Sequence, residues 1–185
     1  TIMVLGDECT RRCRFCAVKT VLKAAPPDPD EPEHVAQAVA ELGLSYLVIT
    51  SVDRDDLPDG GAGHYAACIR ALSRRSPDTV VETLIPDYTG EPLATLMSAG
   101  PHVLAHNVEV VPRLQRKIRD PRCSYERSLD TLRGAKALAP GIFTKSSLML
   151  GHGESAAEVA EAMALLRQAD VDFLTLGQYL RPSPK

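Results

Sequence analysis

Residues 2–16 read Ile2-Met-Val-Leu-Gly-Asp-Glu-Cys-Thr-Arg-Arg-Cys-Arg-Phe-Cys16, an apolar run followed directly by three cysteines. The run from Ile2 to Leu5 has the composition of a buried strand. Cys9, Cys13 and Cys16 follow it with CxxxCxxC spacing, so we expect them in the loop at that strand's carboxyl end. Disulfide pairing at such short spacing is strained, and the total of five cysteines is odd. The sequence therefore predicts metal ligation.

Five more segments rich in β-branched and apolar residues follow this first strand. The strands we expect are Tyr46 to Thr50, Val80 to Ile85, Val103 to His106, Ile142 to Leu150 and Asp172 to Leu176. Helical patterns separate them, and these run through Pro32 to Leu42, Tyr65 to Leu72, Pro92 to Met97, Tyr125 to Leu132 and Ser155 to Leu166. The last pattern opens with a capping box formed by Ser155 and Glu158. Such alternation implies right-handed parallel crossovers, and so either a doubly wound sheet or a barrel.

Polar residues in or beside the expected strands favour the barrel. Buried parallel strands are almost wholly apolar, yet these carry or adjoin Glu82, Asn107, Glu109 and Lys145. We therefore expect a polar ligand in the interior of an α/β fold, an incomplete six-unit (β/α) barrel or partial TIM barrel. Its chemistry is expected at the carboxyl ends of the strands.

Length and composition narrow the class of protein. The 185 residues fit one domain, which we place at residues 1–185. The net charge of -3 argues against nucleic acid as a partner. No apolar run approaches the roughly 20 residues that cross a bilayer, and no signal peptide is evident, so we expect no membrane partner. Free thiolates favour a reducing compartment, the cytoplasm or, in a eukaryote, the mitochondrial matrix.

Three thiolates on one loop can hold three corners of a cubane 4Fe–4S cluster, whereas most such clusters use four cysteines. The remaining iron is then open and can chelate the amino and carboxylate groups of S-adenosylmethionine (SAM). We expect the negative charge of the cluster to be offset by Arg11, Arg12 and Arg14. The alternative is a structural zinc site, which needs a fourth ligand. Candidates for that ligand are His64, His106 and Cys123.

The CxxxCxxC motif after a first strand resembles the signature of the radical SAM superfamily. Further segments resemble lipoyl synthases, and these are Leu5 to Cys13, Thr50 to Gly61, His106 to Glu109, Lys145 to Glu154 and Leu176 to Tyr179. The Thr50 to Gly61 block is the most specific, because the cysteine motif fits many radical enzymes. The resemblance to lipoyl synthases extends over the whole chain. It implies cleavage of SAM to a 5′-deoxyadenosyl radical and sulfur insertion at carbons 6 and 8 of a protein-bound octanoyl-lysine.

The first group of SAM contacts is expected at the ends of the second and fourth strands. Thr50, Ser51 and Asp53 end the second strand and are expected to meet the methionine end of SAM; an ordinary polar loop is the alternative. Asn107 and Glu109 are separated by one residue, so on an extended chain they point the same way. The resemblance implies that they bind the ribose hydroxyls, and a structural hydrogen-bonded pair is the alternative.

The second group lies on the last two strands. Lys145 interrupts an apolar strand and needs a carboxylate partner, which is the ligand's own, Glu109 or Glu82. Leu148 and the residues up to Gly151 are expected to face the adenine. Gln178 and Tyr179 are expected to complete the adenine or substrate wall.

Three tempting residues are expected to have no role in the site. Cys68 lies on the apolar stripe of a helix and is expected to be a small hydrophobe. Cys123 is expected to be an incidental thiol without a partner. His152, between two glycines, is expected to be an exposed loop histidine.

The resemblance also implies partners and a second cofactor. The partners are octanoylated lipoyl carrier domains (the glycine cleavage H protein and 2-oxoacid dehydrogenase acyltransferase subunits) and an electron donor such as ferredoxin or flavodoxin. The family carries an auxiliary 4Fe–4S cluster, held by cysteines upstream of the first strand and by the serine of an Arg-Ser-Ser-Tyr segment. Residues 1–185 contain neither segment, so we expect a core domain from a longer chain. The open alternatives are a biotin synthase-like enzyme and a non-catalytic iron–sulfur or zinc module.

Overall fold

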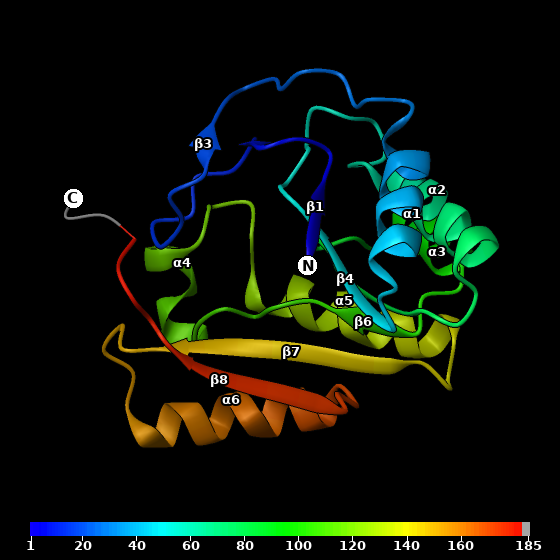
Figure 1. The fold of residues 1–185 in the computed structure, drawn as a ribbon. Helices are drawn as coiled ribbons and strands as arrows, with labels where there is room; N and C mark the ends of the chain where they lie inside the picture. Colours follow the sequence, from blue (N-terminus) through cyan, green and yellow to red (C-terminus); the bar gives the residue numbers. More distant parts are fainter. Residues whose placement is uncertain (183–185) are drawn as a thin grey trace.

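The computed structural model describes residues 1–182, which fold around one curved sheet of six parallel strands (Figure 1). The strands are β1 (Ile2–Val4), β4 (Tyr46–Ser51), β5 (Val80–Leu84), β6 (Val103–Ala105), β7 (Phe143–Leu150) and β8 (Phe173–Gln178). They pair in that order, and β1 and β8 are the two edges. The sheet is therefore an open, partial (β/α) barrel, which confirms the expected fold class.

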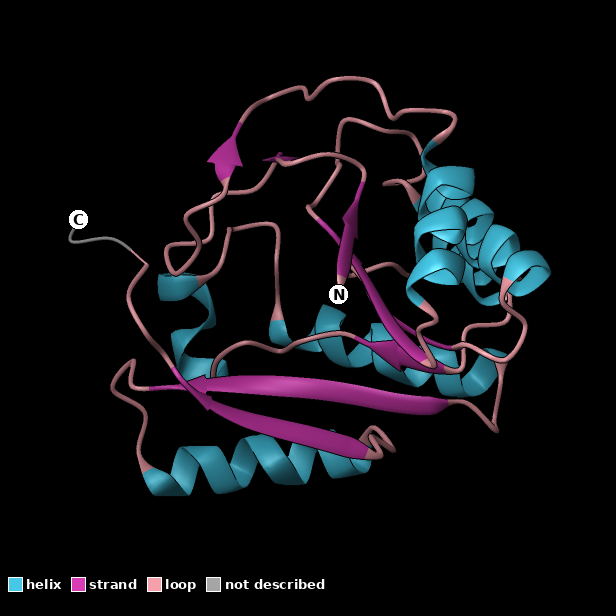
Figure 2. Ribbon diagram, viewed as in Figure 1, coloured by secondary structure: helices cyan, strands magenta, loops and turns pink. Residues whose placement is uncertain are grey.

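Five helices lie on the outer side of the curve (Figure 2). They are α1 (Glu31–Leu42), α2 (Ala62–Arg75), α3 (Gly90–Met97), α5 (Tyr125–Leu138) and α6 (Ala156–Gln168). Pro32 stands in the first turn of α1, where its missing N–H costs no hydrogen bond. The capping box of Ser155 and Glu158 opens α6, as the sequence predicts.

The core lies between the sheet and this outer layer of helices. Leu47 and Ile49 of β4 are buried, and they belong to the same cluster as Val39 of α1 and Ile69 and Leu72 of α2. Burial of each such side chain contributes about 1.5–3 kcal/mol. The alternate residues of the strands face the concave interior. The packing thus leaves one face of the sheet for a ligand.

Four short elements have no counterpart in the sequence pattern. They are β2 (Glu8–Cys9), β3 (Lys19–Thr20), the 3-10 helix η1 (Pro112–Leu114) and α4 (Gln115–Ile118). The cysteine loop and α4 lie on the same side of the molecule, beside the open interior (Figure 1). None of the helices within residues 1–182 is long and apolar enough to cross a membrane.

Candidate active site

The cysteine loop begins where β1 ends, and its three thiols line one cavity. Cys9 and Cys13 are half-buried, Cys16 is exposed, and all three are free. The cavity has a volume of about 190 Å³ and also contains Ser51 and Asp53 from the end of β4. Three sulfur donors that share a cavity with polar residues of the strand ends fit a cluster with one open position.

Backbone hydrogen bonds hold this loop against neighbouring segments. The Thr10 N–H donates to the Asp53 carbonyl at 2.9 Å, and the Arg14 N–H donates to the Ile118 carbonyl at 2.7 Å. The Asp120 N–H donates to Cys13 Sγ at 3.3 Å. The protein chain alone therefore positions the loop.

Arg11 connects the loop to the ends of two strands. Its guanidinium lies 2.8 Å from an Asp55 oxygen, 2.8 Å from an Asp87 oxygen and 3.4 Å from an Asp53 oxygen. Its side chain is only 7% exposed. Arg11 is thus already paired with three carboxylates, whereas Arg12 and Arg14 are exposed; the offset of cluster charge by these arginines stays a prediction.

Asp53 stands between the cysteines and the interior. Cys9 Sγ lies 3.9 Å from Asp53 Oδ2. Burial raises the pKa of Asp53 to about 6, and the nearby Arg11 opposes that rise. The Asp53 side chain remains 24% exposed, so this half-buried carboxylate, with Arg11 as its ion-pair partner at 3.4 Å, can also meet a cationic group from the cavity.

A second cavity, of about 140 Å³, adjoins the cysteine cavity at the ends of β4, β5 and β6. It shares Ser51, Asp53 and Glu109 with the cysteine cavity and adds Thr50 and Asn107. All five residues that the sequence places at the ends of the second and fourth strands therefore meet in one region.

Glu109 reaches this region through an unusual backbone conformation. Its φ is 67°, so the chain turns there and is not extended as expected. Burial raises the pKa of Glu109, while the positive charge of Arg119 and, to a smaller extent, the neighbouring Asn107 oppose the rise. The two side chains still face one cavity.

Arg119 lines the same cavity, although no sequence pattern predicts it. It is buried, and one guanidinium nitrogen donates to Ser128 Oγ at 2.8 Å. Its Nε has no hydrogen-bond partner within residues 1–182. A buried guanidinium with an unused donor is suited to an anionic group. No periodicity marks this segment, so the sequence offers no signal for it.

His106 also lines the second cavity, but its ring is occupied. Nδ1 lies 2.9 Å from the Ile85 carbonyl oxygen and Nε2 lies 3.0 Å from Ser128 Oγ. Burial lowers the pKa of His106 to about 4, and the charge of Arg119 adds to this effect. His106 is therefore a neutral structural residue in this arrangement.

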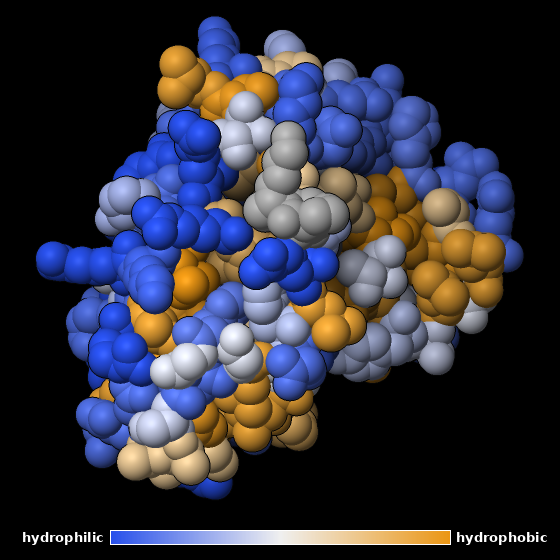
Figure 3. Space-filling view, turned by 90° about the vertical axis from the view of Figure 1, so that its left-hand side faces the viewer, coloured by the Kyte–Doolittle hydropathy of each residue, from blue (hydrophilic) through white to orange (hydrophobic). Residues whose placement is uncertain are grey.

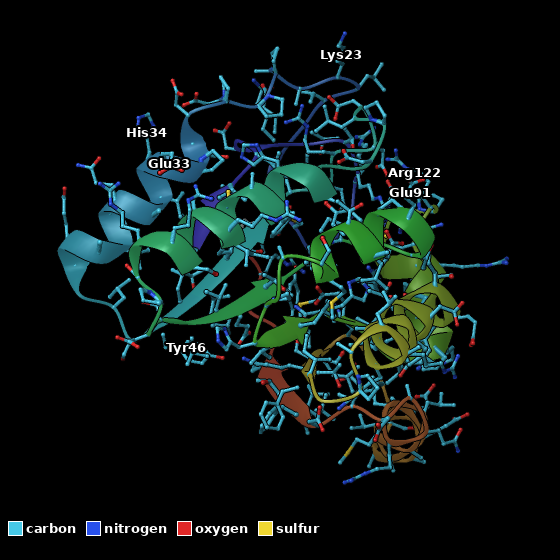
Figure 4. All side chains as sticks on the ribbon, turned by 90° about the vertical axis from the view of Figure 1, so that its right-hand side faces the viewer. Lys23, Glu33, His34, Tyr46, Glu91 and Arg122 are labelled. Atoms are coloured by element: carbon cyan, nitrogen blue, oxygen red, sulfur yellow. The ribbon has the colours of Figure 1, made fainter. Side chains whose placement is uncertain are left out.

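Lys145 pairs with Glu82, one of the partners that the sequence suggests. Its Nζ lies 2.9 Å from Glu82 Oε1, and the Tyr46 hydroxyl donates to Glu82 Oε2 at 2.5 Å. Tyr46 begins β4 and lies on the side of the molecule away from Lys23, which follows the cysteine loop and β3 (Figure 4). Neither cavity of the site is lined by Lys145. Its contact with SAM stays a prediction.

The three remaining expected SAM contacts line neither of the two cavities. Leu148 pairs with Glu109 through a backbone bridge, but its side chain is buried in the core on the face opposite Lys145. Gln178 Nε2 donates to the Leu150 carbonyl at 3.0 Å. Tyr179 stacks on the ring of His152 with centroids 4.2 Å apart. The adenine roles of Leu148, Gln178 and Tyr179 remain predictions.

Two expectations about bystander residues need correction. Cys123 does have partners, because it is buried, is a neighbour of Cys13 and accepts from Arg11 Nη1 at 3.3 Å. The contact with Cys13 lowers the pKa of the Cys123 thiol. His152 is half-buried against Tyr179 and is not an exposed loop residue. Cys68 is buried in the core as expected.

An open six-strand parallel barrel with a three-cysteine loop at the end of its first strand defines a class of protein. The chain belongs to the Radical SAM superfamily, whose sequence pattern matches residues 3–166.

Within that class the chain is similar to lipoyl synthases. It is 58% identical to the chloroplastic lipoyl synthase of Arabidopsis thaliana over 100% of this chain and 47% of the relative. It is 56% identical to the lipoyl synthase of Thermus thermophilus over 100% of this chain and 58% of the relative. The chain thus spans about half the length of the curated relatives it matches.

Solved structures agree on the fold. Methylornithine synthase superposes with a TM-score of 0.77 at 12% identity, covering 96% of this chain and 52% of that chain. HydG, a maturase of the FeFe-hydrogenase, superposes with a TM-score of 0.76 at 14% identity, covering 96% of this chain and 42% of that chain. At such low identity the likeness establishes the partial barrel alone.

Proposed function

We propose that this chain is the radical-generating core domain of a lipoyl synthase. A 4Fe–4S cluster held by Cys9, Cys13 and Cys16 would supply the electron that splits SAM into methionine and a 5′-deoxyadenosyl radical. The observation that carries the proposal is the shared cavity, in which the three thiols meet Ser51 and Asp53. The similarity to lipoyl synthases over the whole chain supports the particular reaction.

The polar groups of the two cavities suit the successive parts of SAM, from its methionine end near the cysteines to its ribose. Ser51 and Asp53 are next to the cysteines and suit the ammonium group, because Asp53 offers a half-buried carboxylate in the cysteine cavity. Arg119, with its unused Nε, suits the carboxylate of the methionine end. Asn107 and Glu109 suit the two ribose hydroxyls. The chain's own residues thereby bind and orient SAM before reaction.

The adenine end would lie toward the ends of β7 and β8. The backbone from Leu148 to Gly151 would contact the base, and the tilted ring pair of Tyr179 and His152 would form an aromatic boundary beside it. The buried Leu148 side chain would support this backbone from behind.

Sulfur insertion at carbons 6 and 8 of a protein-bound octanoyl-lysine would need the rest of the longer protein. We propose an auxiliary 4Fe–4S cluster there as the sulfur source, an octanoylated lipoyl carrier domain as substrate, and a ferredoxin or flavodoxin as electron donor. The free thiols favour a reducing compartment, the cytoplasm or an organelle matrix.

Anaerobic reconstitution tests the proposal. The protein loaded with iron and sulfide should show the electron paramagnetic signal of a reduced 4Fe–4S cluster. Addition of SAM should change that signal, and 5′-deoxyadenosine should form. A cluster that neither responds to SAM nor yields 5′-deoxyadenosine would leave the chain as a non-catalytic iron–sulfur module. Zinc bound in preference to the cluster would have the same consequence.

A further inference from the structure

We propose that the face formed by the cysteine loop and α4 docks a small acidic electron-carrier protein; this inference rests on the proposed function. The cations of this face are Arg12, Arg14, Lys19, Lys23, Arg116, Lys117 and Arg122. The whole chain, by contrast, has a net charge of -3. Positive charge is therefore concentrated here.

Contacts between the loop and α4 make this one surface. Arg14 N–H donates to the carbonyl of Ile118, the last residue of α4, at 2.7 Å. Arg12 and Arg122 line one surface hollow of about 700 Å³ together with Leu22. Figure 3 views the molecule from the side on which α4 and the cysteine loop lie, and strongly hydrophilic residues are prominent there.

Most of these cations are not neutralised by the chain itself. Lys19 pairs with Glu8, and Arg122 pairs with Asp120 and Asp55. The cations of the face that have no ion pair within residues 1–182 are Arg12, Arg14, Lys23, Arg116 and Lys117. A cluster of exposed positive charges attracts an acidic protein and increases its association rate.

The surface also has the apolar centre that a protein interface needs. Leu22 is 98% exposed and Val18 is 38% exposed, and both lie among the cations. Val18 lines the cysteine cavity beside the exposed Cys16. Redox complexes are small and transient, and they combine a few apolar contacts with a charged rim.

The position of the face identifies an electron carrier as the partner. Electron transfer falls steeply with distance, so a donor has to approach the edge of the cluster that solvent reaches. Cys16 is the exposed ligand and belongs to this face. An acidic donor docked over Leu22 and Val18 would bring its redox centre close to Cys16. The octanoyl chain of a carrier domain, by contrast, has to enter the open side of the barrel.

The test is a triple charge reversal that spares the cluster loop. Lys23→Glu, Arg116→Glu and Lys117→Glu change exposed residues that contact neither the cysteines nor the SAM cavities. The matched control reverses Arg70, Arg75 and Arg167, which are exposed residues of α2 and α6. Both variants change the net charge by the same amount.

The readout is 5′-deoxyadenosine formation by the cluster-loaded protein with either dithionite or a reduced acidic flavodoxin. With dithionite, both variants should match the parent protein. With flavodoxin, the docking-face variant should need about tenfold more donor for half its maximal rate at low salt, and the control should not. The difference should shrink as the Debye length falls from about 10 Å at 0.1 M salt to about 3 Å at 1 M.

The outcomes separate the two proposals. No product with dithionite in the parent protein would refute the proposed function itself. Product with dithionite, but an unchanged flavodoxin requirement in the docking-face variant, would overturn the docking proposal alone. A raised requirement for the octanoylated carrier with an unchanged requirement for flavodoxin would reassign the face to the acidic carrier and overturn it equally.

Discussion

Arg11→Met removes the guanidinium that joins the cysteine loop to the strand ends. Asp55, Asp87 and Asp53 lie 2.8, 2.8 and 3.4 Å from that group. Removing one partner of a buried ion pair costs about 3–5 kcal/mol. Asp53 and Asp55 are 24% and 31% exposed, and Asp87 keeps Arg127 at 3.0 Å. We therefore expect the lower end, a loss of about 3 kcal/mol in the free energy of unfolding.

Urea unfolding of the reduced, metal-free protein measures this loss without any contribution from a cluster. Arg12→Met is the matched control, because Arg12 is exposed and its side chain has no ion pair within residues 1–182; it should change stability by less than about 0.5 kcal/mol. In the Arg11→Met variant the buried Asp87 has lost one of its two arginine partners. Adding Asp87→Asn removes this under-compensated charge. The double variant should therefore lose about 1 kcal/mol less than the sum of the two single variants.

Equal losses of stability in Arg11→Met and Arg12→Met, within error, would refute a structural role for the Arg11 ion pairs. Additive effects of Arg11→Met and Asp87→Asn, without coupling, would refute it as well. Either result would mean that the carboxylates find sufficient solvation elsewhere and that Arg11 does not hold the loop in place.

Three further predictions concern other parts of the molecule. Cys16→Ala should lose the reconstituted cluster, whereas Cys123→Ala should keep parental iron content; chemical iron analysis checks both. Burial holds the pKa of His106 near 4 in the folded protein, whereas it is about 6.5 in the unfolded chain. The unfolded chain therefore takes up a proton first as the pH drops from 6.5 to 4, and the contribution of His106 to the free energy of unfolding should fall by about 3 kcal/mol. Urea unfolding of His106→Gln should lack that component. Gly61→Ala would place a Cβ 2.5 Å from a core methyl at φ 92° and should lower the urea midpoint more than Gly43→Ala, which has open space.

Local patterns were sufficient to predict the order of strands and helices. Each expected strand is an apolar run bounded by turn residues, and each major helix has an apolar stripe; both signals come from neighbouring residues. α4 was missed because it has only four residues and is fixed by a tertiary contact. Ile118, its last residue, accepts from the Arg14 N–H at 2.7 Å, a contact with a distant part of the chain.

The candidate site was predictable where strands carry its residues. Parallel strands bring their carboxyl ends to one rim, so Ser51, Asp53, Asn107 and Glu109 had to lie near one another. Arg119 belongs to no strand, and the link from Arg11 to Cys123 spans 112 residues. Contacts between distant loops depend on the whole fold, and no local pattern encodes them.

At two positions of the site the backbone turns where the sequence pattern predicts an extended strand. Leu5, directly before the cysteine loop, and Glu109, in the barrel mouth, both have φ of 67°, which costs about 1–3 kcal/mol for a residue with a side chain. Surrounding contacts hold each one: Leu5 N–H donates to Glu31 Oε2 at 2.9 Å, and Glu109 N–H donates to the Ser147 carbonyl at 3.1 Å. Because leucine is apolar, the sequence pattern predicts that the first strand extends through Leu5, whereas β1 ends at Val4. The structure instead turns the chain there, and that turn directs the cysteine loop over the strand ends where Glu109 lies.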